Sequence, residues 1–359
     1  MGETANADSL LKTRGESRSL EAFVVACAFE RSGRFCAFAL GDGTLRIAEP
    51  AANAEWRSVV VHEGAVLSLA PDAAGGGFLS GGDDGALRRT ATAGEVAEIA
   101  RFGGPRFGGP RFGGQWVEHV ASHEEAKAGG GRIAAAVGKS VHLFDGAGLR
   151  LKSFEHKSTV NGIAFDAKGK RLAASHYNGV SLWFVGAKEA MPRALEWKGS
   201  HLAVALHPDG DAVVTAMQEN ALHGWRLSDG QHMRMSGYPA KTESLSFSRR
   251  GKWLASSGAD AIILWPFFGG GPMGKTPLEL AGGDGVLCTR VACHPLHDAV
   301  AGGFADGLVV LADIDQGRVL PVAAPGRGTV SALAWNADGT RLAFGTESGF
   351  AATVDFSRR

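Results

Sequence analysis

The fold is decided by a short unit near the end of the chain, Val330-Ser-Ala-Leu-Ala-Trp335, Asn336-Ala-Asp-Gly339 and Arg341-Leu-Ala-Phe-Gly345. An apolar run is followed by a polar turn and by a second run that is rich in small residues. A further turn, Glu347-Ser-Gly349, leads into a third apolar run from Phe350 to Phe356. Short apolar runs separated by turns that contain Gly, Asn or Asp are typical of antiparallel strands, so this unit predicts three consecutive strands.

The same unit recurs along the whole chain. The first copy begins with Val24 to Phe29 and continues through the turn Gly41-Asp-Gly43 to Ala48. Eight copies align on the last residue of their first strand, at Phe29, Pro71, Ser122, Phe165, Leu206, Phe247, Cys293 and Trp335. The period is about 42 residues, which is typical of a four-stranded propeller blade. Because one such sheet cannot bury both of its faces alone, the copies are expected to stack against one another.

One interval between copies is longer than the others because it contains a duplicated segment. Between Arg101 and Gly114 the pentapeptide Arg-Phe-Gly-Gly-Pro is repeated. We interpret residues 101–114 as an insertion into a loop of a single domain that spans residues 1–359. Arg and Phe side chains can stack on bases or bind acidic partners. A neutral duplication in a tolerant loop is the simpler interpretation, because lengthening a surface loop costs little stability.

These residues resemble the WD-repeat family, whose unit reads roughly Gly-His, Val-x-x-Val-x-Phe, Ser-Pro-Asp-Gly, Leu-Ala-Ser-Gly, x-Asp-Gly and a third strand that ends in Trp-Asp. The resemblance covers nearly the whole chain and includes Val160 to Phe165 with Asp166-Ala-Lys-Gly169, His207-Pro-Asp-Gly210 and Leu264-Trp265. The final dipeptide is degenerate, since Phe144-Asp145, Ala312-Asp313 and Val354-Asp355 replace it. The resemblance implies an all-β propeller of eight blades, each with four antiparallel strands.

In that family each unit supplies the three inner strands of one blade, after the outer strand of the preceding blade. Seven outer strands are expected, at residues 56–61, 95–100, 149–154, 193–197, 232–235, 277–280 and 319–323. The eighth is expected at the other end of the chain, at Ser9-Leu-Leu-Lys-Thr-Arg14, which is similar to Leu149-Arg-Leu-Lys-Ser-Phe154. This N-terminal strand would close the ring and cover an edge that otherwise invites aggregation. A ring of seven blades, with one triplet of strands outside it, is the alternative.

Composition excludes several classes of function. Lys plus Arg number 37 and Asp plus Glu number 37, so the formal net charge is zero and gives no long-range attraction to nucleic acid or to an anionic membrane. Neither Met1 to Gly15 nor any later segment holds an apolar stretch suited to a signal peptide or a membrane helix. The four cysteines form no CxxC motif. We therefore expect a cytoplasmic, monomeric protein with no membrane association, in which the cysteines remain thiols.

His62, Ser68 and Asp84 have the three residue types of a hydrolase triad. Ser68 lacks the Gly-x-Ser-x-Gly context of a nucleophile elbow. The resemblance instead places these residues in a structural hydrogen-bond network, which ties the loop before an inner strand to the turn between the second and third strands. We expect no catalytic residue.

The richest group of potential metal ligands is Cys293-His294-x-x-His297, with Cys288 upstream. Zinc sites usually need two spaced ligand pairs, and His294-Pro295 fits the turn that follows the inner strand in the resembled family. His119 and His123 are four residues apart, but a strand does not place that spacing on one face. We therefore expect no metal and no other cofactor.

The face of the disc on which the inner strands begin is the expected binding surface, by analogy with the resembled family. The residues at these strand starts are Trp116, Asn161, His201, Glu243, Arg290 and Thr329, which should surround the mouth of the central channel. Exposed Trp and Arg are frequent anchors of protein interfaces. The alternative for Trp116 is that it packs beneath the neighbouring insertion.

The sequence thus favours a non-catalytic scaffold that binds a partner protein or peptide across this face. Two alternatives remain open. A propeller hydrolase or lactonase would require carboxylates or histidines on most inner strands near the axis, whereas these strands are mainly Val, Ala, Leu and Ser. A receptor for a small ligand or a metal ion would use the scattered histidines.

Overall fold

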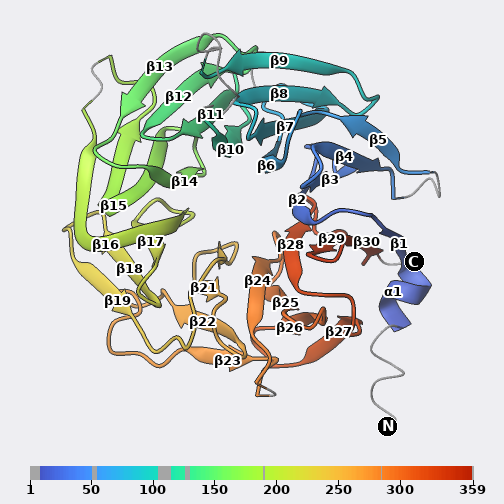
Figure 1. Ribbon diagram of the computed structural model, residues 1–359. Helices are drawn as coiled ribbons and strands as arrows, with labels where there is room; N and C mark the ends of the chain where they lie inside the picture. The colour runs from blue at the N-terminus through green and yellow to red at the C-terminus, as the bar shows by residue number, and fades with distance from the viewer. Residues whose placement is uncertain are drawn as a thin grey trace.

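The computed structural model describes residues 9–50, 55–103, 115–125, 130–188, 191–283 and 285–357. Within these ranges the strands β1 to β30 form antiparallel sheets that follow one another around a ring (Figure 1). Most of the repeated insertion at 101–114 lies outside the described residues.

The first three blades are separate four-stranded sheets. Blade 1 contains β2 (Val24–Phe29), β3 (Cys36–Leu40), β4 (Thr44–Ala48) and β5 (Arg57–Val60). Blade 2 contains β6 (Val66–Pro71), β7 (Gly77–Gly82), β8 (Ala86–Ala91) and β9 (Val96–Arg101). Blade 3 contains β10 (Val117–His123), β11 (Arg132–Val137), β12 (Ser140–Asp145) and β13 (Arg150–Glu155).

The next sheet is larger because two of its elements have double length. It holds β14 (Val160–Phe165), β15 (Arg171–Phe184), β16 (Arg193–Leu206), β17 (Ala212–Met217), β18 (Ala221–Arg226) and β19 (His232–Met235). β15 reverses at Asn178 and Gly179, which both have positive φ. The amide of Val185 then donates to the carbonyl of Lys170 at 2.9 Å, so the two ends of β15 meet. β15 is therefore a hairpin that supplies two strands.

β16 belongs to two blades. Its first part pairs with β15, whereas the part from His201 to Leu206 pairs with β17. The large sheet therefore consists of two four-stranded units in series. Blade 4 contains β14, the two arms of β15 and the start of β16, and blade 5 contains the end of β16 with β17, β18 and β19.

The last three blades are again separate sheets. Blade 6 contains β20 (Leu245–Phe247), β21 (Trp253–Ser256), β22 (Ile262–Pro266) and β23 (Leu278–Leu280). Blade 7 contains β24 (Cys288–Cys293), β25 (Ala299–Phe304), β26 (Val309–Asp313) and β27 (Val319–Ala323). Blade 8 contains β28 (Val330–Trp335), β29 (Arg341–Thr346), β30 (Phe350–Asp355) and β1 (Gly15–Ser19).

The all-β propeller predicted from the sequence is confirmed. Counted as hydrogen-bonded sheets, the described strands form seven, which is the number of the alternative prediction. Counted as four-stranded units, they form eight, one for each copy of the sequence repeat. The inner strands contact one another in the order β2, β6, β10, β14, β16, β20, β24 and β28, and β28 contacts β2, so the ring is closed.

The hydrophobic core lies between neighbouring blades. The second strands β3, β7 and β17 are buried at every position, because each is covered on both faces. Small residues in these strands let the blades approach closely. A Cβ on Gly345 would lie 2.3 Å from Cγ1 of Val24 in the next blade, and a Cβ on Gly303 would lie 2.4 Å from Cγ1 of Val330. A side chain at either glycine would therefore push two blades apart.

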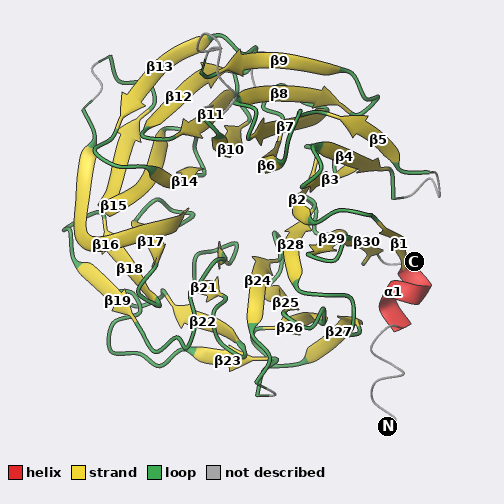
Figure 2. Cartoon of the chain, in the orientation of Figure 1, coloured by secondary structure: helices red, strands yellow, loops and turns green. Residues whose placement is uncertain are grey.

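The N-terminal segment closes the ring, but the strand that does so was predicted at the wrong residues. Residues 9–14 form the helix α1 (Ser9–Arg14), and β1 pairs with β30 from Gly15↔Val354 to Ser19↔Phe350. α1, the red element in Figure 2, packs against β27 and β30 through the buried side chain of Leu11. Leu, Lys and Arg favour helix, and Lys12 and Arg14 lie in its last turn, where cations are stabilised. β1 was missed because Gly-Glu-Ser-Arg-Ser shows no apolar alternation.

α1 has six residues, and in the described part of the chain no helix has the length and apolarity that a membrane span needs.

Candidate interaction face at the channel mouth

Two sets of loops form one face of the disc. The loops that lead into the inner strands are hydrogen-bonded to the turns between second and third strands. Examples are His62 N to Gly43 O at 3.0 Å, His156 N to Lys139 O at 2.9 Å and Glu347 N to Thr329 O at 2.9 Å. We call the face that carries these loops the top face. The turns between first and second strands lie at the other strand ends, on the bottom face.

A cavity of about 440 Å³ lies where several inner strands converge. Its lining includes Ser68 of β6, His119 of β10, Asn161 of β14, Leu202 of β16, and Lys241 and Glu243 from the loop before β20. Side chains from five successive blades meet here, so the cavity lies near the axis of the ring. Its lining is both apolar and polar, as in many ligand sites.

His119 is the least satisfied polar group of this cavity. Its ring makes no hydrogen bond to any described residue. Burial lowers the pKa of His119 to about 4, so the ring is neutral at neutral pH. A neutral imidazole offers one donor and one acceptor, which a ligand in the cavity could use. The sequence flagged His119 only as a possible metal ligand.

Glu243 and Arg290 form an ion pair beside the cavity. Arg290 Nη1 lies 2.9 Å from Glu243 Oε2, and Lys241 Nζ lies 3.6 Å from Glu243 Oε1. Burial opposes ionisation of Glu243, but the hydrogen bonds and positive charges of Arg290 and Lys241 together outweigh it and hold the pKa of this carboxyl below its ordinary value. Arg290 Nε also donates to Ser331 O at 2.8 Å, so one guanidinium connects blades 6, 7 and 8.

The other residues predicted at the channel mouth have different surroundings. Trp116 is 54% exposed, so it is not packed beneath a described segment. Asn161 Nδ2 donates to His201 O at 3.2 Å. Thr329 is half-buried and donates to Ala305 O at 3.1 Å.

His201 is not at the surface, and its predicted place on the binding face is corrected. Its side chain is fully buried, with Nδ1 2.7 Å from Thr215 Oγ1 and Nε2 2.9 Å from Trp197 O. The register shifts between His201 and Val204, and this bulge turns the His201 ring away from the channel into the body of blade 5.

The predicted network around His62 contains a different serine. His62 Nδ1 lies 2.9 Å from Asp84 Oδ1, and Nε2 lies 2.9 Å from Ser80 Oγ. Because a carboxylate only accepts, Nδ1 donates to Asp84 and Nε2 accepts from Ser80. Ser68 instead donates to Val117 O in the next blade, at 3.5 Å. A bulge between Val66 and Ser68 gives the Ser68 side chain this direction.

Burial affects both ionisable groups of this network. Burial lowers the pKa of His62, against the effect of Asp84. Burial also works against the charge of Asp84, but the hydrogen bonds from His62 and from the Ala86 amide hold its pKa below the ordinary value. Ser80 and His62 are both buried, and their hydrogen bonds tie the loop before β6 to β7 and to the turn at Asp84.

Other blades use the same position with different residues. In blade 6, Tyr238 takes the place of the histidine, with its hydroxyl 2.5 Å from Ser256 Oγ, and Trp265 Nε1 donates to it at 2.7 Å. In blade 4, Trp183 Nε1 donates to His156 Nε2 at 3.1 Å. The sequence did not single out Tyr238, because a tyrosine stands where the repeat has its histidine, after Gly237 and in a loop of variable length.

The cysteine and histidine group near residue 293 has partners within the fold. His294 Nε2 lies 3.0 Å from Gly339 O, and its Nδ1 accepts from the amides of Leu296 and His297. Cys293 Sγ donates to Ser246 O at 3.2 Å, and burial raises the pKa of its thiol to about 12. Both ring nitrogens of His294 are thus used, which leaves none for a metal. No cluster of three or more potential ligands occurs among the described residues.

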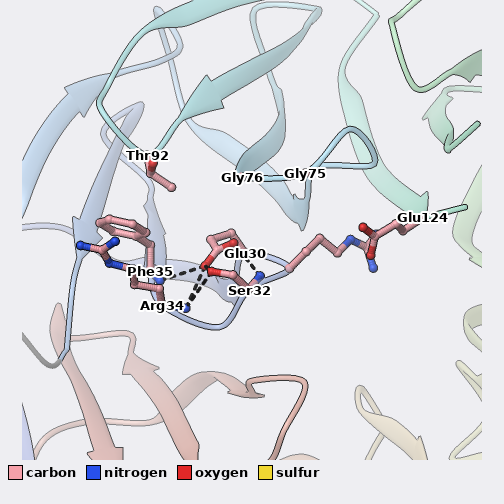
Figure 3. A pocket seen from close by; sticks show the side chains of 9 residues that line it. Glu30, Ser32, Arg34, Phe35, Gly75, Gly76, Thr92 and Glu124 are labelled. Atoms are coloured by element: carbon pink, nitrogen blue, oxygen red, sulfur yellow. Dashed lines mark hydrogen bonds between the residues drawn. The ribbon is translucent and has the colours of Figure 1, made fainter. Parts of the chain in front are cut away.

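A second cavity, of about 490 Å³, lies on the bottom face (Figure 3). The carboxylate of Glu30 accepts from the amides of Ser32 at 2.7 Å and Arg34 at 2.8 Å. Arg31, also in its lining, donates to Ser122 Oγ at 2.7 Å and to Asp72 O at 3.2 Å. These polar groups hold the turn together, so they are not available to a ligand without the loss of those bonds.

Comparisons with known proteins agree with this arrangement. The family described as WD domain, G-beta repeat matches residues 148–183. The crystal structure of the computationally designed Ika8 protein is similar, with a TM-score of 0.72 at 18% identity, over 94% of this chain and 98% of that one. At that identity the likeness concerns the fold alone. No curated protein matches the chain. Residues 148–183 thus match the WD repeat, and the closed ring of four-stranded sheets that contains them is a β-propeller.

Proposed function

We propose that the protein is a non-catalytic scaffold that binds a partner protein or peptide on its top face. WD-repeat propellers are typically protein-interaction scaffolds, and that coarse assignment follows from the family. The observation that carries the finer proposal is Trp116, which is 54% exposed on this face, only three residues before the cavity-lining His119. A large amphipathic side chain that directly precedes a strand of the ring is a strong interface anchor.

The surroundings of Trp116 support the same face. The Glu243 and Arg290 pair offers both charges at the rim of the cavity, and Asn161 keeps its amide oxygen for a partner because only its Nδ2 is used. Thr329 lies at the corresponding position of blade 8. An extended segment that crosses the mouth could thus meet an aromatic surface, an ion pair and an amide in turn.

An enzymatic role finds less support. The Ser68 hydroxyl and the His119 ring both line the cavity, but no hydrogen bond joins them. Glu243 is paired with two cations and is held ionised, which suits recognition better than proton transfer.

The unpartnered His119 favours the receptor hypothesis, in which a small polar ligand occupies the cavity.

We further propose that the protein is a cytoplasmic monomer that binds neither nucleic acid nor membranes. Its four cysteines are free thiols, as a reducing compartment would keep them. Burial raises the pKa of Cys27 and Cys288 to about 12, which suppresses their reactivity.

Affinity capture from the native cell tests the proposal. The wild type is compared with Trp116→Ala and with Leu296→Ala, since Leu296 is 43% exposed in a bottom-face turn. We expect Trp116→Ala to lose the captured proteins and Leu296→Ala to retain them. Equal recovery with all three baits, or loss only with Leu296→Ala, would place the interface elsewhere.

A further inference from the structure

Four neighbouring segments on the top face are held side by side across blades 3, 4 and 5. The amide of His156 donates to Lys139 O at 2.9 Å. The amide of Tyr177 donates to Ser158 Oγ at 3.1 Å, and the amide of Gly199 donates to Asn178 Oδ1 at 3.3 Å. These bonds connect the turn at residues 138–139, the loop at 156–159, the turn at 177–179 and the middle of β16 at 198–200 into one continuous surface.

This surface carries positive charge and one aromatic ring. Lys139, Lys157 and Lys198 are all exposed, and none of them forms an ion pair with a described residue. Tyr177 lies between them and is 59% exposed. We call Lys139, Lys157, Tyr177 and Lys198 the basic arc.

The adjoining part of the top face, on blades 1 and 2, has the other sign. The equivalent loops of blades 1 and 2 carry Glu21, Asp42, Glu63 and Asp83. The chain as a whole has no net charge. The charge separation on the top face therefore comes from where the charged residues lie and not from an excess of one sign in the sequence. A partner with a local excess of charge would be oriented on it.

We propose that the basic arc binds an acidic, extended segment of the partner protein, with an apolar side chain of that segment against the Tyr177 ring. This inference rests on the proposed function and adds the chemistry and position of the partner. Ammonium groups without partners lose no existing ion pair when carboxylates approach. The hydrogen-bonded loops fix their spacing before binding, which reduces the entropy lost on association.

The neighbouring acids favour a short protein segment over a uniform polyanion. Glu155 and Glu219 are exposed beside the arc, and both would repel a regularly charged strand such as DNA. The acids of blades 1 and 2 would do the same to a lipid surface that covers the whole face. A peptide can instead place two or three carboxylates near the lysines and neutral residues elsewhere.

A displayed library of random dodecapeptides, selected on the immobilised full chain, tests this inference. The expected result is enrichment of peptides with several Asp or Glu and one large apolar residue. A synthetic peptide from that pool is then measured by fluorescence anisotropy. We expect the peptide to bind the triple variant Lys139→Glu, Lys157→Glu, Lys198→Glu at least tenfold more weakly than it binds wild type. We also expect its affinity for wild type to weaken as the salt concentration rises.

The chain offers a matched control on the bottom face. Lys168, Lys170 and Lys252 are exposed in turns between first and second strands, and their reversal to Glu makes the same change in net charge. This control should bind the peptide as wild type does. Circular dichroism of both triple variants verifies that they fold, and the milder set Lys139→Gln, Lys157→Gln, Lys198→Gln should give an intermediate loss if the reversal unfolds the chain.

The outcomes separate this inference from the proposed function. Enriched peptides that are not acidic would contradict the role of the basic arc but not binding on the top face. The same holds for peptides whose binding is unchanged by the arc substitutions but is lost in Trp116→Ala. Enriched peptides insensitive to both changes would overturn both. Failure to enrich any peptide, or an arc-dependent affinity for a single-stranded oligonucleotide or for phosphatidylserine vesicles that exceeds that for peptides, would overturn the choice of an acidic protein segment.

Discussion

Glu243 of blade 6 and Arg290 of blade 7 lie 2.9 Å apart, between Oε2 and Nη1, at the rim of the axial cavity. The Glu243 side chain is 49% exposed and that of Arg290 is 26% exposed. Solvent therefore screens much of their attraction. Their position suits recognition at the surface more than it suits stabilisation of the ring.

The first prediction concerns this pair. Arg290→Ala should lower the free energy of unfolding by about 1–2 kcal/mol, because it removes a solvent-screened ion pair and the hydrogen bond to Ser331 O. The same change should weaken partner capture clearly. Urea unfolding of the purified chain checks the first part, and capture from cells checks the second. A loss of several kcal/mol with unchanged capture would show that Arg290 serves the fold and not the interface.

The second prediction compares two buried threonines. Thr90 in β8 and Thr215 in β17 are both fully buried. Thr90 Oγ1 has no hydrogen-bond partner among the described residues, whereas Thr215 Oγ1 contacts His201 Nδ1 at 2.7 Å and donates to His223 O at 3.2 Å. Thr90→Val should therefore stabilise the chain by about 1 kcal/mol, and Thr215→Val should destabilise it by about 1–3 kcal/mol.

Thermal and urea unfolding of the two variants give the comparison directly. Each change replaces a hydroxyl with a methyl group of similar size, so packing changes little. If both variants were destabilised alike, the Thr90 hydroxyl would be making a favourable interaction in the folded chain, and the prediction would be wrong.

Much of this architecture can be predicted from the sequence. Seven of the eight anchor residues end an inner strand, Phe29, Pro71, Phe165, Leu206, Phe247, Cys293 and Trp335, and the eighth, Ser122, is one residue before its end. The outer strands at 232–235 and 319–323 have the predicted bounds. These positions are readable because buried strands need apolar residues, and tight turns need Gly, Asn or Asp.

The direction of individual side chains was harder to predict. β6 and β10 have a bulge near their start, and β16 has one between His201 and Val204, where its pairing with β17 begins. A bulge inserts a residue and reverses the alternation that follows, which the sequence does not reveal. For this reason Ser68 was assigned to a network that uses Ser80, and His201 was placed on a face from which it is hidden.

The third prediction concerns acid. His223 is fully buried, stacks on Trp197 at 4.1 Å between ring centroids, and has Nε2 2.9 Å from His232 Nδ1. Burial, with smaller effects of His232, His201 and Arg234, lowers its pKa from 6.5 to about 3. As the pH falls below 6.5 the unfolded chain therefore takes up a proton that the folded chain refuses. Stability should fall by about 1.4 kcal/mol per pH unit for each such histidine, down to the folded pKa.

The variant His223→Phe isolates this contribution, because a phenyl ring can keep the stacking on Trp197 without titrating. Its unfolding free energy should decline less between pH 6.5 and pH 4.5 than that of the wild type, as measured by urea unfolding at each pH. An unchanged slope in His223→Phe would mean that His223 is protonated in the folded chain.

The fourth prediction concerns ring closure. Removal of residues 9–19 together with what precedes them would leave β30 as an open edge, since β1 pairs with it along five residues. It would also uncover the apolar cluster that Leu11 covers, which includes Val322, Ala323 and Val354. Exposed strand edges next to apolar surface favour association between chains. We expect the truncated chain to unfold at a lower temperature and to form oligomers in size-exclusion chromatography.

Addition of a synthetic peptide with the sequence of residues 9–19 distinguishes lost closure from general damage. If β1 acts by occupying the edge of β30, the peptide should restore the monomer and raise the unfolding temperature. The same peptide with Gly15→Val should fail, because a side chain at this position would meet Leu11 O at 2.5 Å. A truncated chain that stays monomeric and equally stable would show that contacts between β28 and β2 alone close the ring.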